Sequence, residues 1–600
     1  MYLTIRKLLS LLSPEERRRG YFLLAMVVAM AILDMVGIAS ILPFMSVLSN
    51  PDVVVSNKYL AAVYREMNFS SAESFLAFLG LTVFVLLLFS TAFKALTTYS
   101  LLRFSQMREY SISRRLVAGY LHQPYDWFLN RHSADIGKTV LSEVGQVING
   151  SVVPMMQLIA QGAVALAIMC LLVVAQPMVA VAMILGLGAV YATIYVSSRR
   201  YLSRLGADRV IANRQRYQVT HEAFGGIKDV KVAGLEESLL LRFESPAKRY
   251  AKTQTASQLV AQLPRYALEI VAFGGMLSLA TYAISLPGGL GSALPLMALY
   301  GLAGFRLLPA LQQIYAHLTR IRFSGPALDR LYTDISALPP VAEALPATGT
   351  ERPSQLANGL ALVHVTYSYP NAQRDALNGF SMDVPAHSIV GLVGTTGSGK
   401  TTAVDILLGL LSPQAGQLLV DGVPISPINV RAWQRMVGYV PQQVFLIDDT
   451  VAANIAFGVP ADQVDHAAVE RAGRIANLHD FVSTQLPQGY QTAIGERGVR
   501  LSGGQRQRIG IARALYHDPE VLVLDEATSA LDNLTEQAVM EAVNNLGHRK
   551  TIVLIAHRLS TVRDCDKIFI LEDGKLVDQG GYTELLERNA RFRAMAGAAH

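Results

Sequence analysis

The sequence has few charged residues and few cysteines, and both shortages limit the kind of protein that it can be. Only 16% of its 600 residues are charged, while 51% are hydrophobic. This composition excludes a disordered chain and is too apolar for an ordinary soluble enzyme, so it predicts membrane spans. Its two cysteines, Cys170 and Cys565, fall in a predicted span and in a predicted cytosolic domain. We therefore expect free thiols and no disulfide framework.

The sequence also lacks a basic block, although its formal net charge is +6. Its Lys and Arg residues cluster beside apolar segments, which membrane topology explains and nucleic-acid binding does not. We therefore expect membrane lipids and no nucleic acid among its partners. A chain of this length exceeds one hydrophobic core, so we expect two or more domains.

Six stretches are long and apolar enough to cross a hydrocarbon core of about 30 Å as helices. They are residues 21–44, 75–101, 151–175, 178–198, 257–284 and 292–318. The first is too long for the core of a cleaved signal peptide, so we expect it to be retained. Arginine is concentrated before the first span and after the second and fourth, whereas the other intervals carry few or no positive charges. By the positive-inside rule, both termini are cytosolic.

The interval between the first two spans contains apolar residues at helical spacing. Leu60, Val63, Tyr64 and Met67 recur at i, i+3, i+4 and i+7, which predicts an amphipathic helix near residues 57–69. Such a helix could lie on the outer membrane surface or pack as a short loop helix. The spacing alone does not choose between the two.

A stretch rich in proline and alanine separates the apolar half of the chain from the rest. It includes Pro339, Pro340, Pro346 and Pro353 and has little apolar periodicity. We place a linker at residues 336–358, after a transmembrane domain at 1–335 and before a cytosolic domain at 359–600.

The first candidate functional motif of the cytosolic domain is a glycine-rich turn after an apolar strand. The candidate phosphate-binding run is Gly394, Thr395, Thr396, Gly397, Ser398, Gly399, Lys400, Thr401 and Thr402, and its first eight residues fit G-x-x-x-x-G-K-[ST]. Glycines let backbone N–H groups surround phosphates at the start of a helix. Lys400 would then reach the β- and γ-phosphates of ATP, and Thr401 would bind Mg²⁺.

Two carboxylates follow a second apolar strand, residues 521–524. Asp525 and Glu526 would lie at the C-terminal edge of a parallel sheet, where ligands bind. Asp525 suits the Mg²⁺ shell, and Glu526 suits general-base activation of the attacking water. His557 ends another apolar strand, 551–556, at the same predicted edge, from which it could reach a γ-phosphate.

The segment Leu501, Ser502, Gly503, Gly504, Gln505, about twenty residues before the Asp525 strand, resembles the signature of ATP-binding cassette proteins. Further segments match this family in order. The resemblance implies that Tyr369 stacks on adenine, that Gln442 joins Mg²⁺ to the membrane domain, and that the loop ending at Asp532 crosses a dimer interface. Residues 495–498 are similar to the exporter-specific segment that precedes the signature.

The resemblance also implies an assembly. In this family two cassettes enclose ATP between the phosphate loop of one and the signature of the other, and this chain has one cassette. Because Glu526, His557 and the signature are all present, we expect a homodimer with two working sites. The fold class implied is an all-α, six-helix exporter domain followed by an α/β P-loop domain.

Three cations lie within the predicted spans: Lys94, Arg265 and Arg306. An ionisable residue there costs about 2.5 to 3.5 kcal/mol on insertion scales and usually has a function. All three fall in the cytosolic half, where they could grip a pyrophosphate headgroup. Equally, Glu269 could neutralise Arg265 on one helix face, and Lys94 could pair with Asp34 or extend to the interface.

The outer helix, the segment 123–125 and residues 305–309 resemble PglK-type flippases of lipid-linked oligosaccharides. This resemblance implies ATP-driven transfer of a polyprenyl-pyrophosphate glycan to the outer leaflet of a bacterial inner membrane. An exporter of hydrophobic drugs or lipids on the same fold is the first competitor. A non-transporting regulator or channel is the second, and the intact Glu526 argues against it.

Overall fold

The computed structural model describes residues 2–69, 71–175, 177–284, 289–338, 355–370, 372–495, 498–526, 536–537, 540–543, 546, 549–556 and 558–597. The chain divides into two compact units. The first comprises Met1–Gln123 and Asn130–Ala344, and the second comprises Pro124–Leu129 and Leu345–His600. A helical domain followed by a domain with sheets confirms the predicted fold class.

In its described part, the first unit contains helices alone. They are α1 (Tyr2–Leu11), α2 (Pro14–Ala39), α3 (Ile41–Ser49), α4 (Val53–Ser56), α5 (Lys58–Glu66), α6 (Ala72–Leu121), α8 (Ser133–Lys138), α9 (Val144–Val147), α10 (Val153–Ala175), α11 (Pro177–Gly225), α12 (Ile227–Ala233), α13 (Glu236–Ile284) and α14 (Gly289–Ala337), with π-helical turns at Thr139–Glu143 and Ile148–Val152.

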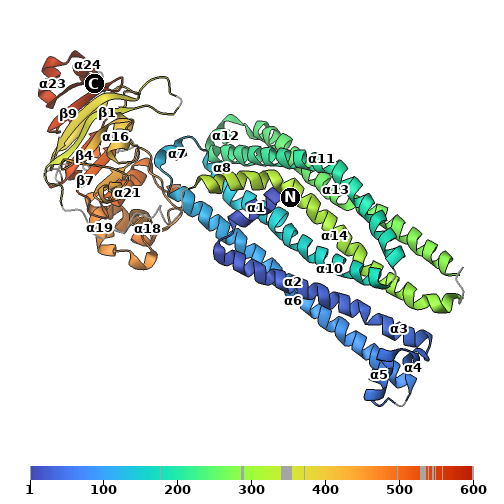
Figure 1. Ribbon diagram of the computed structural model, residues 1–600. Helices are drawn as coiled ribbons and strands as arrows, with labels where there is room; N and C mark the ends of the chain where they lie inside the picture. Colours follow the sequence, from blue (N-terminus) through green and yellow to red (C-terminus); the bar gives the residue numbers. More distant parts are fainter. Residues whose placement is uncertain are drawn as a thin grey trace. The chain divides into compact units, whose positions relative to one another are not determined.

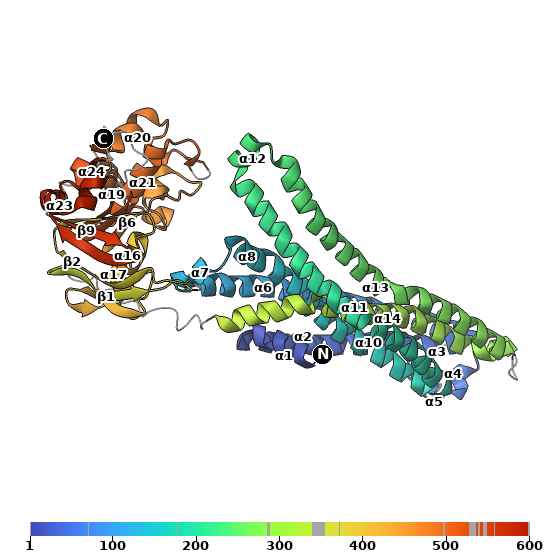
Figure 2. The ribbon, with the colours of Figure 1, turned by 90° about the horizontal axis from the view of Figure 1, so that it is seen from above.

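Four helices, α6, α11, α13 and α14, are 49 or 50 residues long. About 20 residues cross a bilayer as a helix, so each has a polar extension beyond any membrane-spanning part. Helices α11 and α13 run side by side and are joined at one end by α12 (Figures 1 and 2). Helices α2 and α6 also pair along their length.

Length and apolar composition identify three candidate spans in the described part of the chain: Pro14–Leu48, Ala72–Leu121 and Ser133–Val174. They contain nearly all of the first three predicted stretches. The other three predicted stretches lie in α11, α13 and α14, and their crossing of the membrane stays a prediction.

The apolar faces of α2, α10 and α14 form one core of the helical unit. Val27 and Met30 of α2 are buried with Ile168 of α10 and Leu307 of α14. A helix that buries one face in this way can leave its other face to lipid, because lipid chains are as apolar as leucine. Exposed residues such as Val28 and Ile32 of α2 fit that arrangement.

The predicted outer helix forms as α5, close to the predicted bounds. Leu60 and Tyr64 pack against a cluster that includes the fully buried Phe75, and the Tyr64 and Phe75 ring centroids lie 5.3 Å apart. Tyr59 and Met67 remain exposed. One face of α5 is therefore packed on the protein, while the other is open to the surroundings.

The second unit contains two sheets. Its strands are β1 (Gly359–Tyr367), β2 (Leu377–Pro385), β3 (Ile389–Gly394), β4 (Ala415–Val420), β5 (Val423–Pro424), β6 (Val437–Val440), β7 (Val521–Asp525), β8 (Thr551–Ile555), β9 (Lys567–Glu572) and β10 (Lys575–Gly580). The antiparallel sheet has the order β2-β1-β4-β5, and the larger sheet has the order β10-β9-β3-β8-β7-β6.

Helices cover the larger sheet and complete the unit. They are α7 (Tyr125–Leu129), α16 (Lys400–Leu407), α17 (Val430–Gln434), α18 (Val451–Ile455), α19 (His466–Ile475), α20 (His479–Gln485), α21 (Gly503–Leu515), α23 (Tyr582–Arg588) and α24 (Ala590–Gly597), with short 3₁₀ turns between them. Strands β6, β7, β8, β3 and β9 are mutually parallel. Because parallel strands end at one edge, the residues after β3, β6 and β7 gather there.

Candidate functional site

The phosphate loop after β3 has a backbone that only glycine can form. Gly394, Gly397 and Gly399 have φ of 156°, 80° and 104°, values that L side chains rarely adopt. A Cβ at Gly394 would lie 2.3 Å from the carbonyl oxygen of Leu571, and one at Gly399 would lie 2.6 Å from that of Ala376. The glycine spacing read from the sequence is therefore required by torsion at all three positions and also by lack of space at Gly394 and Gly399.

The loop holds a buried cation and a buried hydroxyl. Lys400 Nζ donates hydrogen bonds to the carbonyl oxygens of Gly394, at 2.8 Å, and Thr395, at 2.9 Å. Burial lowers the pKa of Lys400, although Glu526 and Asp525 oppose the shift. Ser398 is 2% exposed, and its Oγ has no hydrogen-bond partner among the described residues. A buried unpaired hydroxyl beside a lysine fits a phosphate-binding loop.

Glu526 lies at the end of β7 in direct contact with Gln442, which follows β6. Gln442 Nε2 donates a 2.7 Å hydrogen bond to Glu526 Oε2. Glu526 has φ of 49°, a left-handed conformation that is uncommon for a residue with a side chain and often marks a functional site. The adjacent Asp525 is buried. The structure thus brings together Gln442 and Glu526, two predicted site residues from separate segments of the chain.

Thr401, Gln442 and Asp525 supply the hydroxyl, amide and carboxylate oxygens that Mg²⁺ prefers when phosphates complete its shell. The described residues include no group of three or more His, Cys, Asp or Glu side chains suited to a metal ion. This donor set therefore fits a magnesium ion carried in with a nucleotide, and it does not fit a dedicated metal cage.

The signature segment forms the N-terminus of α21. Ser502 is the N-cap residue: its Oγ accepts from Gln505 N, while Ser502 N donates to Gln505 Oε1. This capping box leaves Ser502 exposed at the helix end, where backbone N–H groups attract anions. Further along α21, Gln507 Nε2 donates a 3.1 Å hydrogen bond to Glu526 O, so the signature helix is tied to the candidate base.

Tyr369 lies beside the phosphate loop, with its hydroxyl 3.1 Å from Thr402 Oγ1. Its stacking on adenine stays a prediction. His557 and Asp532, assigned to γ-phosphate contact and to a dimer interface, lie outside the described residues.

Sequence reasoning missed three residues near this site: Asp405, Tyr439 and Gln507. Burial raises the pKa of Asp405 on α16 to about 6, and the charge of Asp525 raises it further. The pKa of Tyr439 is raised by burial and by Asp525, with which it forms a hydrogen bond. A tyrosine on β6, a glutamine two residues beyond the signature and an aspartate within α16 carry no pattern of their own, so no sequence signal could have found them.

The short helix α7 groups with the second unit, although the surrounding chain belongs to the first. Burial raises the pKa of Tyr125 on α7, and nearby Asp405 raises it further. Helix α7 therefore contributes a tyrosine to the surroundings of α16.

In the helical unit, Lys94 and Arg306 share one carboxylate. Lys94 Nζ lies 3.5 Å from Asp34 Oδ2, and Arg306 Nη1 lies 3.6 Å from Asp34 Oδ1. Asp34 is 2% exposed and also accepts a 3.0 Å hydrogen bond from Ser90. The two cations are 33% and 28% exposed. This cluster joins α2, α6 and α14 and carries a formal charge of +1.

Arg265 is not brought into this cluster by any described contact. Its Nε lies 2.9 Å from Glu269 Oε1, one turn along α13, and both side chains are well exposed. Of the three candidate cations, two are therefore assembled on one carboxylate, and the third has the i, i+4 partner that the sequence offered.

Residues 377–529 match the ABC transporter family, and residues 20–288 match the ABC transporter transmembrane region. The chain is 33% identical over 478 residues to an ATP-dependent lipid A-core flippase of Cupriavidus metallidurans, covering 79% of each chain. It is 34% identical over 427 residues to an ATP-dependent lipid A-core flippase of Alkalilimnicola ehrlichii, covering 69% of each. A bacterial Atm1-family ABC exporter with ATP bound has the same fold, with a TM-score of 0.77 at 24% identity over 97% of this chain and 98% of that one.

Proposed function

Since the chain belongs to the ABC transporter family as an exporter half-transporter, we propose that it flips a polyprenyl-pyrophosphate-linked oligosaccharide from the cytosolic to the outer leaflet of a bacterial inner membrane. ATP hydrolysis in the cassette is coupled to this transport. Both termini and the cassette would be cytosolic, and the active unit would be a homodimer.

The observation that carries the substrate class is the Asp34 cluster. A buried carboxylate with two partly exposed cations leaves one positive charge uncompensated in a helical unit rich in apolar surface. A net positive charge near hydrocarbon is costly, and a phosphate or pyrophosphate group would relieve that cost through charge-assisted hydrogen bonds. Lys94 and Arg306 are therefore the residues that we assign to the headgroup.

The cassette residues have distinct roles in hydrolysis. Lys400 and the loop N–H groups would bind the phosphates, and Glu526 would accept the proton of the attacking water. Gln442 donates to Glu526 and would hold that carboxylate in place. Thr401, Gln442 and Asp525 would hold Mg²⁺, which neutralises phosphate charge when bound. Exposed Ser502 would face the phosphates bound by a second copy.

A lipid A-core glycolipid is the second candidate, because several relatives carry that name. Its chemistry fits the same cluster if its headgroup bears phosphate. An exporter of hydrophobic drugs predicts no dependence on Lys94 and Arg306, since an apolar compound gains nothing from them. The intact cassette site argues against a channel or regulator.

The test is ATP-dependent translocation in reconstituted vesicles, with three cargoes compared: a polyprenyl-pyrophosphate glycan, lipid A-core and a hydrophobic drug. We expect the glycan to move fastest and K94Q/R306Q to slow it at least tenfold while basal ATPase activity persists. R265Q, which alters a cation with its own partner, is the matched control. Faster transport of lipid A-core than of the glycan would show that the proposed substrate is wrong. Glycan transport by K94Q/R306Q at the rate of the unchanged protein would show that the Asp34 cluster has no role in transport.

A further inference from the structure

A groove between α2 and α6 collects arginine side chains beside aromatic ones. It has a volume of about 660 Å³ and is lined on α2 by Arg18, Arg19, Phe22, Leu23 and Met26, and on α6 by Tyr99, Ser100, Arg103, Phe104, Met107 and Arg108. Its described lining holds four arginines and no acid. The groove is separate from the Asp34 cluster, none of whose residues line it.

The arginines of this groove are not neutralised as a group. Arg108 pairs with Glu16, whose Oε1 lies 2.6 Å from Arg108 Nη1. The oxygens of Glu16 also accept hydrogen bonds from Ser111 Oγ and Ser13 N. Most of the hydrogen-bond-accepting capacity of this carboxylate is therefore already used. Arg18 and Arg103 are exposed and form no ion pair with another described residue. At least two positive charges therefore face the groove uncompensated.

Arg108 is a buried, packed residue in the wall of the groove. It is 5% exposed, and its guanidinium lies 4.8 Å from the centre of the Phe104 ring. Its Nε is buried without a hydrogen-bond partner among the described residues. A fixed, incompletely satisfied guanidinium behind exposed arginines favours an anion at this position.

The groove lies where both helices change from polar to apolar. The apolar run of α2 begins at Tyr21, two residues after the last of three arginines, and the apolar run of α6 ends near Leu101. This is the level of lipid headgroups on the side that the positive-inside rule assigns to the cytosol. Exposed Phe22 and Tyr99 stand beside the arginines, as suits a ligand with a charged head and an apolar tail.

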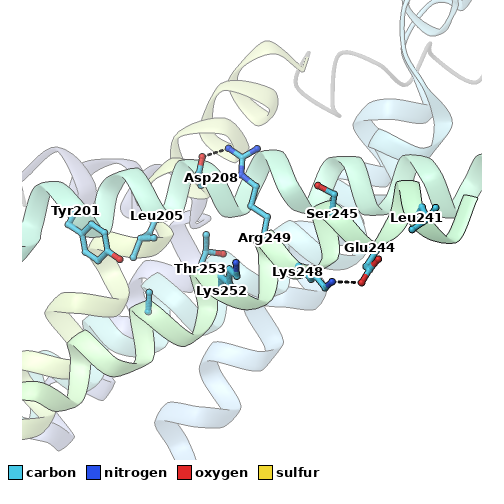
Figure 3. Close-up of a pocket in the computed structure, with 11 residues that line it drawn as sticks. Tyr201, Leu205, Asp208, Leu241, Glu244, Ser245, Lys248, Arg249, Lys252 and Thr253 are labelled. Carbon is cyan, nitrogen blue, oxygen red and sulfur yellow. Dashed lines mark hydrogen bonds and ion pairs between the residues drawn. The ribbon is translucent and has the colours of Figure 1, made fainter. Parts of the chain in front are cut away.

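A second pocket, between α11 and α13, provides a contrast (Figure 3). It has a similar volume, about 730 Å³, and holds three basic residues. There Arg249 pairs with Asp208, and Lys248 pairs with Glu244. Because acids neutralise two of its three cations, this pocket lacks the charge excess of the α2–α6 groove.

We propose that the α2–α6 groove binds the phosphate headgroup of an anionic membrane lipid in the cytosolic leaflet. Arg18 and Arg103 hold the phosphate, and Phe22 and Met26 contact the acyl chain. The inference rests on the membrane orientation of the proposed function and not on its transported substrate. Its test measures lipid binding without ATP, so its failure is distinguishable from a failure of transport.

The test uses a tryptophan probe in the groove, F22W, and brominated lipids that quench it at short range. The chain's own tryptophans, Trp127 and Trp433, both belong to the second unit and give a constant background. The protein is reconstituted in phosphatidylcholine vesicles with increasing fractions of dibrominated phosphatidylglycerol or dibrominated phosphatidylcholine. The ratio of the two apparent association constants reports preference for the anionic headgroup.

We expect F22W to prefer phosphatidylglycerol and R18Q/R103Q in that background to lose roughly fivefold in preference for each arginine removed. R199Q/R200Q removes two exposed arginines at the end of another apolar run and should keep the ratio within about twofold. Equal quenching by both lipids, or an unchanged ratio in R18Q/R103Q, overturns the proposal. Displacement of the brominated lipid by millimolar inorganic phosphate would also overturn it, by assigning the groove to a soluble anion.

Discussion

Gln442 and Glu526, which lie 84 residues apart in the sequence, are joined by a 2.7 Å hydrogen bond at the edge of the larger sheet. The bond orients one oxygen of Glu526 through a segment that follows β6, while the backbone of Glu526 is held by Ile555 O and Gln507 Nε2. One contact therefore orients the carboxylate and two hold the backbone that carries it, an arrangement suited to a proton acceptor.

Replacing Glu526 by Gln should abolish most hydrolysis and leave ATP binding in place. The change removes the proton acceptor but keeps size and polarity, so we expect kcat to fall by about 10²- to 10⁴-fold. Steady-state phosphate release and binding of a fluorescent ATP analogue measure the two properties separately. E520Q, just before the start of β7, is the control and should retain activity. Near-normal hydrolysis by E526Q would reject Glu526 as general base.

Replacing Gly399 by Ala should prevent ATP binding, because the new methyl group would lie 2.6 Å from Ala376 O at a φ of 104°. The loop must open to relieve the contact, and its N–H groups would no longer converge. G422A tests the torsion alone: Gly422 has φ of 81° and open space around its Cβ position, so it should cost only about 1 kcal/mol of stability. Equal ATP affinities for G399A and G422A would contradict the steric argument.

Glu143 and Arg209 form a buried ion pair, and we expect the loss of either side chain alone to destabilise the protein. Arg209 Nη2 lies 2.7 Å from Glu143 Oε2, and both side chains are at most 3% exposed. Removing one partner leaves a buried charge, so E143Q or R209M alone should destabilise the protein by about 3 to 5 kcal/mol. Thermal unfolding in detergent measures this.

The double variant E143Q/R209M leaves no charge behind and should recover part of that loss. The exposed pair of Arg242 and Glu222 on α13 and α11 provides the matched control, R242Q/E222Q, with an expected change of about 1 kcal/mol or less. Simple additivity at the buried pair would mean that the two charges do not stabilise each other.

Asp405 should make the second unit less stable as pH rises. Its folded pKa is raised from 3.8 to about 6 by burial and by Asp525, so the folded protein binds this proton more tightly than the unfolded chain does. The resulting stabilisation is complete below about pH 4, is lost as pH rises to about 6, and is absent above it.

D405N should therefore raise the unfolding temperature at pH 7.5 and give no advantage below about pH 4. The gain corresponds to at most about 3 kcal/mol, from about 1.4 kcal/mol per pKa unit. Tryptophan fluorescence follows the second unit, because both tryptophans lie in it. D462N, at an exposed position, should show no such pH dependence. A constant difference between D405N and the native protein across this range would contradict the assigned shift.

The sequence by itself determined the two-part architecture and the residue types of the cassette. Lys400 and its glycines are contiguous, and Asp525 and Glu526 follow an uninterrupted apolar strand, so local pattern was sufficient to place them on a loop and at a sheet edge. The apolar runs predicted helices for a similar reason, since length and composition are local properties. The pairing of Arg265 with Glu269, four residues apart, could also be predicted from their spacing along one helix.

The tertiary structure decided what contacts what across the chain. It joined Gln442 to Glu526 and gathered Lys94 and Arg306 on Asp34. It also left Arg18 and Arg103 facing one groove with no acid among its described lining residues. Each of these depends on which faces of separate helices or strands meet. Side-chain packing over distances of tens to hundreds of residues fixes those faces, and periodicity within a single element carries no information about its neighbour.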